Sequence, residues 1–238
     1  MEEYAVRLKD VTFFNKSFIM SHLTLDIKKG YITVITGENG SGKTALTEAI
    51  AGAAHITEGE VLIENYNLHT QFIQAKNQIG FIFRNCPFDK HLTPFDCMNM
   101  YGGFYQEFDN QSFQKNCQEF QINLKEKIIH MSKGQAIKLQ LAFALAHDAK
   151  ILILDDATEG LDPVFRKSLK KKLSELVSDG NHTVIMASKL PEDFDRIADY
   201  IVTLKDGKIQ EIMDAEEIRE KCPQGIAEYL KKGGGEHE

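Results

Sequence analysis

Eight residues near the N-terminus, GENGSGKT, have the spacing of a loop that binds phosphate groups. Glycines at fixed places let backbone N–H groups approach phosphate oxygens, and the positive end of a following helix adds to the attraction. The lysine reaches the terminal phosphates, and the threonine hydroxyl ligates Mg²⁺. A β-branched run precedes the loop and the helix-prone run TALTEAIAG follows it, as this pattern requires. The sequence therefore predicts that phosphate is bound by Gly37, Glu38, Asn39, Gly40, Ser41, Gly42, Lys43 and Thr44.

A second stretch, ILILDD from Ile151 to Asp156, is apolar and ends on two adjacent carboxylates. A strand of this kind is buried on both faces, and an isolated charge is costly to bury, so the aspartates indicate a ligand. In a phosphate-loop fold we expect this strand to lie beside the strand that feeds the loop. Asp155 would then hold the Mg²⁺ through water, together with Thr44, and Asp156 would face the attacking water. The competing interpretation is a strand that ends on two surface aspartates.

A third stretch, MSKGQ from Met131 to Gln135, begins a predicted helix. Ser132 and Gln135 form the S-x-x-Q pattern of a capping box. Gly134 lies in the first turn, where a glycine weakens a helix but lets the backbone approach a phosphate. A well-capped helix without a further role is the competing interpretation. The apolar positions that follow helical spacing are Ile137, Leu141, Ala144 and Leu145.

The composition is that of a globular protein large enough for one domain with a full core. The chain has 238 residues, of which 42% are hydrophobic and 26% are charged. Its net charge of -7 argues against nucleic-acid binding, which normally requires a basic surface. The cysteines show no zinc-binding or disulfide pattern, and no apolar run approaches the roughly 20 residues that span a bilayer. We therefore expect no nucleic-acid partner and a chain that stays in the aqueous phase.

Alternating strands and helices must position these motifs. Asp162 and Pro163 begin a helix as its N-cap and first residue. The inner face of this helix carries Phe165, Leu169, Leu173 and Leu176. A hairpin over residues 200–212 turns at Asp206 and Gly207. The other strand-like runs cover residues 4–13, 18–27, 31–36 and 183–187.

The order of the motifs resembles that of ATP-binding cassette (ABC) ATPases. GENGSGKT, MSKGQ, ILILDD and EGLD correspond to the Walker A, signature, Walker B and D-loop motifs, and the resemblance extends from about Val6 to Ile212. It implies an α/β fold, a P-loop NTPase with a RecA-like mixed sheet flanked by helices, an N-terminal antiparallel β subdomain and a helical subdomain insertion. We expect a single ATP-binding domain at residues 4–226, with the helical subdomain at about 88–145, and a flexible tail at residues 227–238.

The resemblance also implies roles for individual residues. Phe14 falls where an aromatic side chain stacks on adenine, although a core phenylalanine is the competing interpretation. Asp162 is the D-loop residue that touches a second cassette. The signature residues that act on the nucleotide of this second cassette are Ser132, Lys133, Gly134 and Gln135. Aromatic residues in the helical subdomain are candidates for a groove that binds a helix of a membrane partner, namely Phe95, Tyr101, Phe104 and Tyr105.

Three positions depart from the family pattern. Arg84 stands where the family has the Q-loop glutamine, and an arginine cannot accept a bond from metal-bound water, so we expect it to meet a γ-phosphate, an acidic neighbour or solvent. Asp156 stands in place of the catalytic glutamate and is shorter by one methylene, about 1.5 Å. Lys189 replaces the switch histidine and can only donate hydrogen bonds. We predict that Asp156 and Lys189 are the catalytic residues of a slow site.

These departures lie on the chain's own Walker face, whereas the signature keeps its serine, second glycine and glutamine. We hypothesise that the chain binds ATP and Mg²⁺ tightly, hydrolyses ATP slowly at its own site and completes a competent site on a different cassette. A homodimer is the alternative. Lys133 and the stretch GLDPVFR are similar to small bacterial exporter ATPases that pair with a separate membrane subunit.

The resemblance therefore implies the nucleotide-binding subunit of an ABC transporter. Such a subunit is cytoplasmic and peripheral on the inner face of the cell membrane, where it is held by an integral membrane partner. The competing function is a nucleotide-gated regulatory or assembly cassette with negligible ATPase activity and no transport role.

Overall fold

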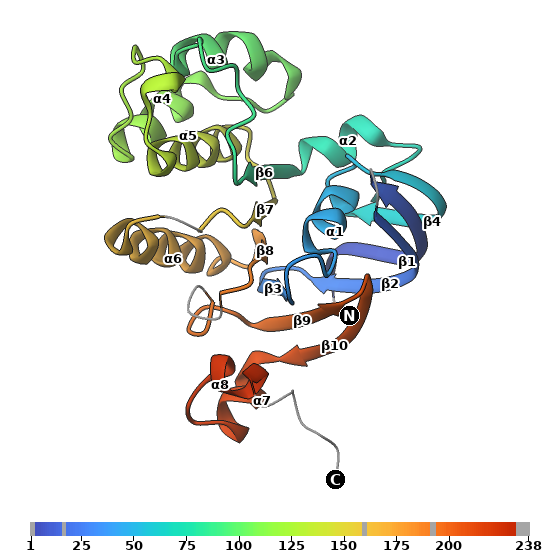
Figure 1. The fold of residues 1–238 in the computed structure, drawn as a ribbon. Helices are drawn as coiled ribbons and strands as arrows, with labels where there is room; N and C mark the ends of the chain where they lie inside the picture. The colour runs from blue at the N-terminus through green and yellow to red at the C-terminus, as the bar shows by residue number, and fades with distance from the viewer. Residues whose placement is uncertain (1–2, 16–17, 159–160, 191–193, 232–238) are drawn as a thin grey trace.

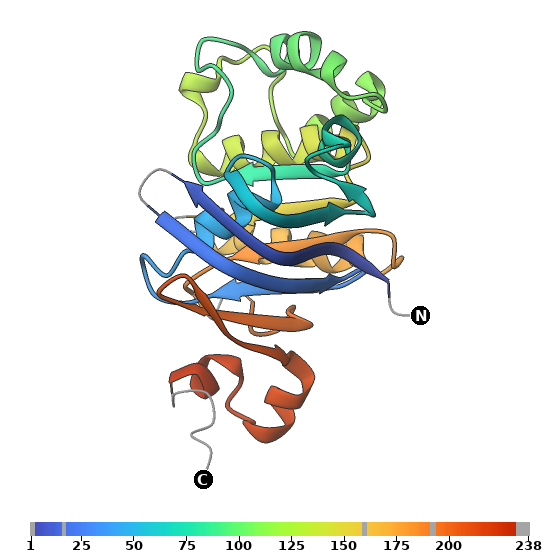
Figure 2. The same cartoon turned by 90° about the vertical axis from the view of Figure 1, so that its right-hand side faces the viewer.

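Two β-sheets with one helix packed between them form the centre of the molecule, and further helices surround them (Figure 1). The computed structural model describes residues 3–15, 18–158, 161–190 and 194–231. A view turned by 90° shows the N-terminal sheet in front of the central sheet, one group of helices at the top and the C-terminal helices at the bottom (Figure 2). This is the predicted mixed α/β architecture.

The central sheet has six strands in the order β10-β9-β3-β8-β7-β6. The strands from β9 to β6 are parallel to their neighbours, and β10 is antiparallel to β9. Strands β3, β7 and β8 are buried along their whole length, which explains why their sequences are continuous apolar runs. The bounds are Ile32–Thr36 (β3), Ile79–Phe83 (β6), Ile151–Asp155 (β7), Thr183–Ala187 (β8), Tyr200–Lys205 (β9) and Lys208–Asp214 (β10).

The N-terminal sheet is antiparallel and has the order β2-β1-β4-β5. Alternate side chains such as Leu8, Leu25 and Ile63 are buried on its inner face. The predicted antiparallel subdomain is therefore confirmed. Its strands are Tyr4–Asn15 (β1), Phe18–Lys28 (β2), His55–Ile63 (β4) and Tyr66–Asn67 (β5).

Helix α1, Lys43–Ile50, fills the space between the two sheets. Its Leu46 and Ile50 belong to one core cluster with Leu8 of the N-terminal sheet and Ile153 of the central sheet. Because the helix is packed from both sides, the loop that precedes it has a fixed end.

A group of helices follows β6, the edge strand of the central sheet, in the chain. Helix α5 is buried on two sides, because Ile137 and Leu141 join the core cluster of the central sheet while Leu139 and Phe143 join the cluster of the helical group. The four apolar positions predicted for this helix all belong to the side that faces the central sheet, and the second buried side was not predicted. The group consists of α3 (Pro94–Tyr101), η1 (Gly102–Phe104), α4 (Asn110–Glu119), η2 (Ile128–His130) and α5 (Lys133–Ala146), and α2 (Phe72–Asn77) precedes β6.

A cavity of about 350 Å³ lies beside α5 and is lined by residues of α1, β6 and the helical group. Three of the four aromatic residues predicted for a partner groove line it, namely Tyr101, Phe104 and Tyr105. Phe95 is exposed and lies outside this lining.

Helix α6, Pro163–Val177, begins as predicted. The Asp162 side chain accepts a hydrogen bond from the Phe165 N–H at 2.9 Å. Leu169 and Leu173 are buried, and Phe165 and Leu176 pack against the same cluster.

The C-terminal segment is more ordered than predicted. Residues 226–231 form helix α8 after helix α7 (Ala215–Lys221), so a flexible tail beginning at 227 is wrong. Ile226 is fully buried, Tyr229 and Leu230 pack against its cluster, and Asp195 Oδ1 accepts the Ile226 N–H at 2.6 Å. The spacing i, i+3 and i+4 of these apolar residues is a short helical signal that composition alone does not reveal. Residues 232–238 lie outside the described residues.

Gly80 on β6 offers a test of how closely α5 approaches the sheet. A Cβ atom at this position would lie 2.5 Å from the Cβ of Ala144. We expect Gly80→Ala to lower the free energy of unfolding by about 1–3 kcal/mol through overpacking, as measured by urea denaturation. Gly103→Ala is the matched control, because a Cβ there would meet no atom within 4 Å. Equal stability of the two variants would contradict the close approach.

Candidate nucleotide site

The phosphate-loop pattern connects β3 to α1. Gly37, Gly40 and Gly42 have positive φ angles of 152°, 82° and 105°. A Cβ atom on Gly37 would come within 2.2 Å of the Leu204 carbonyl oxygen, so this position requires glycine. Gly42 is the N-cap of α1, and no side chain of the described residues caps this helix end. The first N–H groups of α1 are therefore oriented toward a site that favours an anion.

Lys43 is buried at the base of this loop. Its ammonium donates hydrogen bonds to the carbonyl oxygens of Gly37 and Glu38, both at 2.8 Å. The Ser41 hydroxyl is buried and has no hydrogen-bond partner in the described part of the chain. Phosphate oxygens would satisfy the Ser41 hydroxyl and could replace the two carbonyl oxygens at Lys43, so the loop fits a phosphate group.

Thr44 and Asp155 meet at the start of α1. The Thr44 hydroxyl lies 3.1 Å from each carboxylate oxygen of Asp155 and donates to them. The expectation that β7 lies directly beside β3 is wrong, because β8 is inserted between them. The contact forms nevertheless, since Thr44 is in the first turn of a helix that crosses the ends of these strands.

The surroundings of Asp155 suit a divalent cation. Burial raises the pKa of this carboxyl to about 6, the hydrogen bond from Thr44 lowers it, and the carboxylates of Asp156 and Glu48 raise it further. No group of three or more His, Cys, Asp or Glu side chains among the described residues could hold a metal ion. A hydroxyl and one carboxylate are the hard oxygen ligands of Mg²⁺, which keeps several waters and takes phosphate oxygens for the rest. Thr44 and Asp155 therefore fit Mg²⁺ bound together with a phosphate.

Three further predicted site residues follow the carboxyl ends of parallel strands in the central sheet. Ile35 pairs with Ala187, Ala187 with Asp155, and Asp155 with Phe83, so four parallel strands reach one level. Asp156 and Arg84 are the next residues along β7 and β6, and Lys189 lies two residues after Ala187. The register therefore brings these three predicted residues to the loop's end of the sheet.

Charge contacts place two of these residues, Asp156 and Lys189, near Lys43. Burial lowers the pKa of Lys43 most, the carboxylates of Asp156 and Asp155 raise it, and the ammonium of Lys189 lowers it. The backbone of Asp156 has a left-handed φ of 44°, which is uncommon for a residue other than glycine, and its N–H donates to the Ala187 carbonyl oxygen at 3.0 Å. Asp156 is half-buried and Arg84 is exposed.

Phe14 is not part of the core. Its ring is 44% exposed and lies 4.9 Å from the His55 ring, whereas the neighbouring Phe13 is fully buried. The core interpretation is therefore wrong for Phe14, and stacking on adenine stays a prediction.

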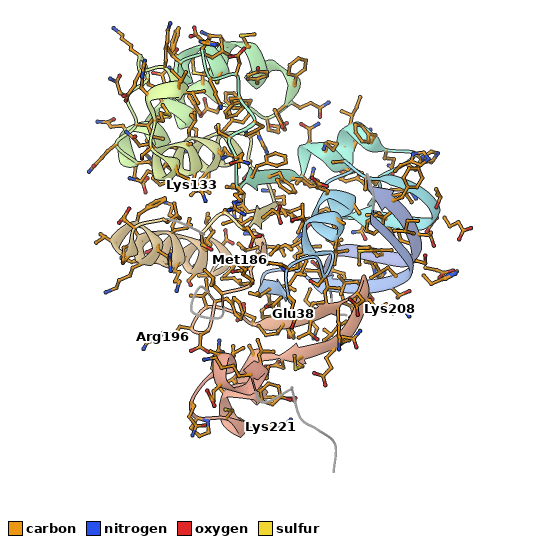
Figure 3. All side chains as sticks on the ribbon, viewed as in Figure 1. Glu38, Lys133, Met186, Arg196, Lys208 and Lys221 are labelled. Atoms are coloured by element: carbon orange, nitrogen blue, oxygen red, sulfur yellow. The ribbon has the colours of Figure 1, made fainter. Side chains whose placement is uncertain are left out.

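The signature residues lie at the start of α5. The Ser132 side chain accepts from the Gln135 N–H and the Gln135 side chain accepts from the Ser132 N–H, which confirms the capping box. A Cβ atom on Gly134 would meet its nearest neighbour, a Phe165 ring carbon, at an ordinary 3.6 Å, so the packing of this chain does not require glycine there. Lys133 at this helix end and Glu38 on the phosphate loop lie well apart (Figure 3). The two motifs of one chain therefore do not enclose the same phosphate.

The D-loop is described only in part. Asp162 is exposed and caps α6, and residues 159 and 160 of the EGLD motif lie outside the described residues.

Two neighbours of the loop were missed by the sequence analysis. The β9–β10 turn braces the loop, because the Gly207 N–H donates to the Ser41 carbonyl oxygen at 3.0 Å. A contact between segments this far apart leaves no local sequence signal. Glu48 adds negative charge near Asp155, and its position four residues after Thr44 on the same helix is a spacing that could have indicated it.

Comparison with known proteins decides the family. A family model described as "ABC transporter" matches residues 20–159. The chain belongs to the ABC transporter family. The predicted recognition is thereby confirmed.

Curated relatives of this ABC protein are ATP-binding proteins. It is 27% identical to an uncharacterized ABC transporter ATP-binding protein of Bacillus subtilis, over 81% of this chain and 63% of the relative. It is 32% identical to a sulfate/thiosulfate import ATP-binding protein of Mesostigma viride (84% and 58%) and 30% identical to a spermidine/putrescine import ATP-binding protein of Mycoplasma mycoides (92% and 64%). The chain thus spans less than two thirds of the length of these relatives.

Solved structures share the fold of this ABC domain. The ATP-binding subunit of an ABC transporter superposes with a TM-score of 0.84 at 19% identity, over 96% of this chain and 98% of that one. A dimeric ATP-binding cassette in a post-hydrolysis state, bound to ADP and Pi, superposes with a TM-score of 0.77 at 24% identity, over 88% and 98%. The predicted fold class is confirmed.

Among the described residues, none of the helices has both the length and the apolar character needed to cross a bilayer.

The buried charge of Asp155 predicts a pH-dependent effect of Asp155→Asn without nucleotide or Mg²⁺. Because the native pKa of about 6 lies above the ordinary value of 3.8, folding favours the protonated carboxyl, and its stabilising effect is lost as the pH rises through 6. We expect the asparagine variant to exceed the wild type in unfolding free energy by about 3 kcal/mol at pH 8 and by roughly half of that at pH 5. Urea denaturation at both pH values measures this difference, and an equally large gain at the two values would contradict it.

Proposed function

We propose that this protein is the nucleotide-binding subunit of an ABC transporter, which binds and slowly hydrolyses ATP with Mg²⁺ to drive a separate membrane-spanning partner. One observation carries the proposal: the phosphate loop, the buried Lys43 and the Thr44–Asp155 pair converge at the start of α1. Membership of the family supports the same conclusion.

In the proposed complex the loop from Gly37 to Thr44 surrounds the β- and γ-phosphates. Lys43 exchanges its two carbonyl partners for phosphate oxygens, and Thr44 and Asp155 hold the Mg²⁺. Mg²⁺ held by these two residues would supply positive charge that offsets the charge of the phosphates. Phe14, exposed beside His55, stacks on the adenine.

We propose that hydrolysis at this site is slow. Asp156 orients the attacking water, and its carboxylate reaches about 1.5 Å less far than a glutamate would. A misplacement of this size costs about a hundredfold in rate. Lys189 donates to the γ-phosphate as a point charge but cannot relay a proton as an imidazole does.

A second cassette completes the site. Gly134 is not required by the packing of its own chain, which supports a role against the nucleotide of another subunit, together with Ser132, Lys133 and Gln135. One structural relative was solved as a dimer bound to ADP and Pi. Because the departures affect the chain's own Walker face, we favour a heterodimer with a cassette that has a glutamate and a histidine at these positions. Asp162 touches the partner in this arrangement.

The aromatic cavity next to β6 is the proposed contact with the membrane partner. It is lined by Tyr101, Phe104 and Tyr105, and Phe104 is 76% exposed at this surface. An amphipathic helix of an integral membrane subunit fits such a groove. Another structural relative is described as part of an ABC transporter complex, which supports a location on the inner face of the cell membrane through this partner.

The second candidate function is a regulatory or assembly cassette with negligible ATPase activity and no transport role. The replacements at Asp156 and Lys189 favour it, because these two are the predicted catalytic residues. Co-purification from membranes separates the two functions, since only the transporter subunit requires an integral membrane partner.

The first prediction for this function concerns binding. At an Mg·ATP concentration of about one hundred times Kd, we expect a stabilisation of about 3 kcal/mol and a Tm increase of about 5–10 °C. Lys43→Ala should abolish the increase, because the phosphates lose their buried cation. Lys171→Ala, at an exposed lysine of α6, is the control and should leave it unchanged. Nucleotide binding is excluded if Mg·ATP does not move the Tm of the wild type.

The second prediction concerns turnover by the purified chain. Asp156→Glu should raise the ATPase rate by about ten- to a hundredfold, because it restores the reach of the carboxylate. Asp156→Asn should lower it, because the carboxylate is lost. A wild-type rate that matches or exceeds that of the glutamate variant would overturn the proposal of a slow site.

A further inference from the structure

Gln140 is a polar residue in a part of α5 that is otherwise buried and apolar. Its side chain is 3% exposed, and its neighbours Leu139 and Leu141 belong to different core clusters. Burying a carboxamide is costly unless its hydrogen bonds are made, and an apolar side chain would fill this position at lower cost. The hydrogen bonds of this carboxamide therefore indicate why it is there.

The carboxamide binds the end of the edge strand. Gln140 Oε1 accepts from the Phe83 N–H at 2.8 Å, and Nε2 donates to the Phe83 carbonyl oxygen at 3.2 Å and to the Ala136 carbonyl oxygen at 3.3 Å. β6 is the last strand of the central sheet, so its outer backbone groups have no strand to pair with. At Phe83 the side chain of Gln140 replaces the missing strand.

Phe83 lies at the level where the sheet reaches the nucleotide site. On its inner side it pairs with Asp155, and the next residue along its own strand is Arg84. Phe83 thus connects Asp155, the carboxylate proposed to hold the metal, to Gln140 on α5. The last backbone unit before Arg84 is held on both sides.

We propose that Gln140 is a positioning residue that holds Arg84 toward the terminal phosphate of the bound nucleotide. This inference rests on the proposed function, and of the contacts expected for Arg84 it concerns the one with the γ-phosphate. An arginine matches phosphate oxygens with a planar pair of donors, and this geometry depends on a fixed backbone.

The attachment of α5 to the sheet does not depend on this carboxamide. Ala144 already approaches Gly80 closely, and Ile82 packs in one cluster with Ile137 and Leu141. Apolar contacts therefore hold α5 against β6 without the carboxamide, and the carboxamide additionally orients the end of β6. It also links this strand end to the signature, because Gln135 precedes Gln140 by only five residues, about 7.5 Å along the helix.

Gln140→Met tests the proposal, because methionine has a similar length and no amide. Hydrogen exchange should become at least tenfold faster at the Phe83 amide. Titration calorimetry should give a three- to tenfold weaker Kd for Mg·ATP and a change of less than twofold for Mg·ADP, which lacks the γ-phosphate. In an Arg84→Ala background the same substitution should leave the Mg·ATP affinity unchanged. Asn116→Leu is the matched control, because its side-chain amide donates to the Ala142 carbonyl oxygen of α5, away from the sheet.

Each outcome separates the two proposals. If the wild type binds neither nucleotide, the proposed function fails and this inference fails with it. If the wild type binds both, but Gln140→Met weakens Mg·ATP and Mg·ADP equally, leaves both unchanged, or acts equally without Arg84, only the role of Gln140 is overturned. If the methionine variant does not fold, Gln140→Asn makes the same test, because its shorter side chain cannot reach Phe83.

Discussion

The site depends on a carboxylate held at the end of a buried strand, where ionisation is unfavourable. Asp155 has a pKa raised to about 6 by burial, and the nearby negative charges of Asp156 and Glu48 add to the effect. Lys43 and the Thr44 hydroxyl offset part of this charge, and a divalent cation would offset the remainder. The arrangement is kept because α1 is packed between two sheets and cannot withdraw from the strand ends. The fold therefore keeps the Asp155 carboxylate in a place where its ionisation is unfavourable, and binding of a cation would remove this cost.

Features encoded by neighbouring residues could be predicted from the sequence. The structure has the loop where predicted, the capping box of Ser132 and Gln135, and the helix cap at Asp162. Each of these features depends on residues that lie within one turn of each other in the sequence. The continuous apolar runs identified the buried strands for the same reason.

Features set by topology could not be predicted in this way. The insertion of β8 between β3 and β7 is a matter of strand order, which a strand's own residues do not encode. The burial of α5 on two sides and the bonds of Gln140 to Phe83 depend on segments far apart in the chain. The roles of Phe14, Arg84 and Lys189 need a nucleotide or a partner and stay predictions.

The two hydrogen bonds from Lys43 to its own loop have a consequence for the cycle of the protein. The ammonium of Lys43 already donates hydrogen bonds to the carbonyl oxygens of Gly37 and Glu38 before any anion binds. When a phosphate binds, its oxygens replace these two carbonyl oxygens as acceptors at Lys43, and when it leaves the carbonyl oxygens return. Lys43 is therefore never left as a buried cation without hydrogen-bond acceptors. A vacated loop can therefore hold its shape between rounds and be ready for the next molecule without refolding.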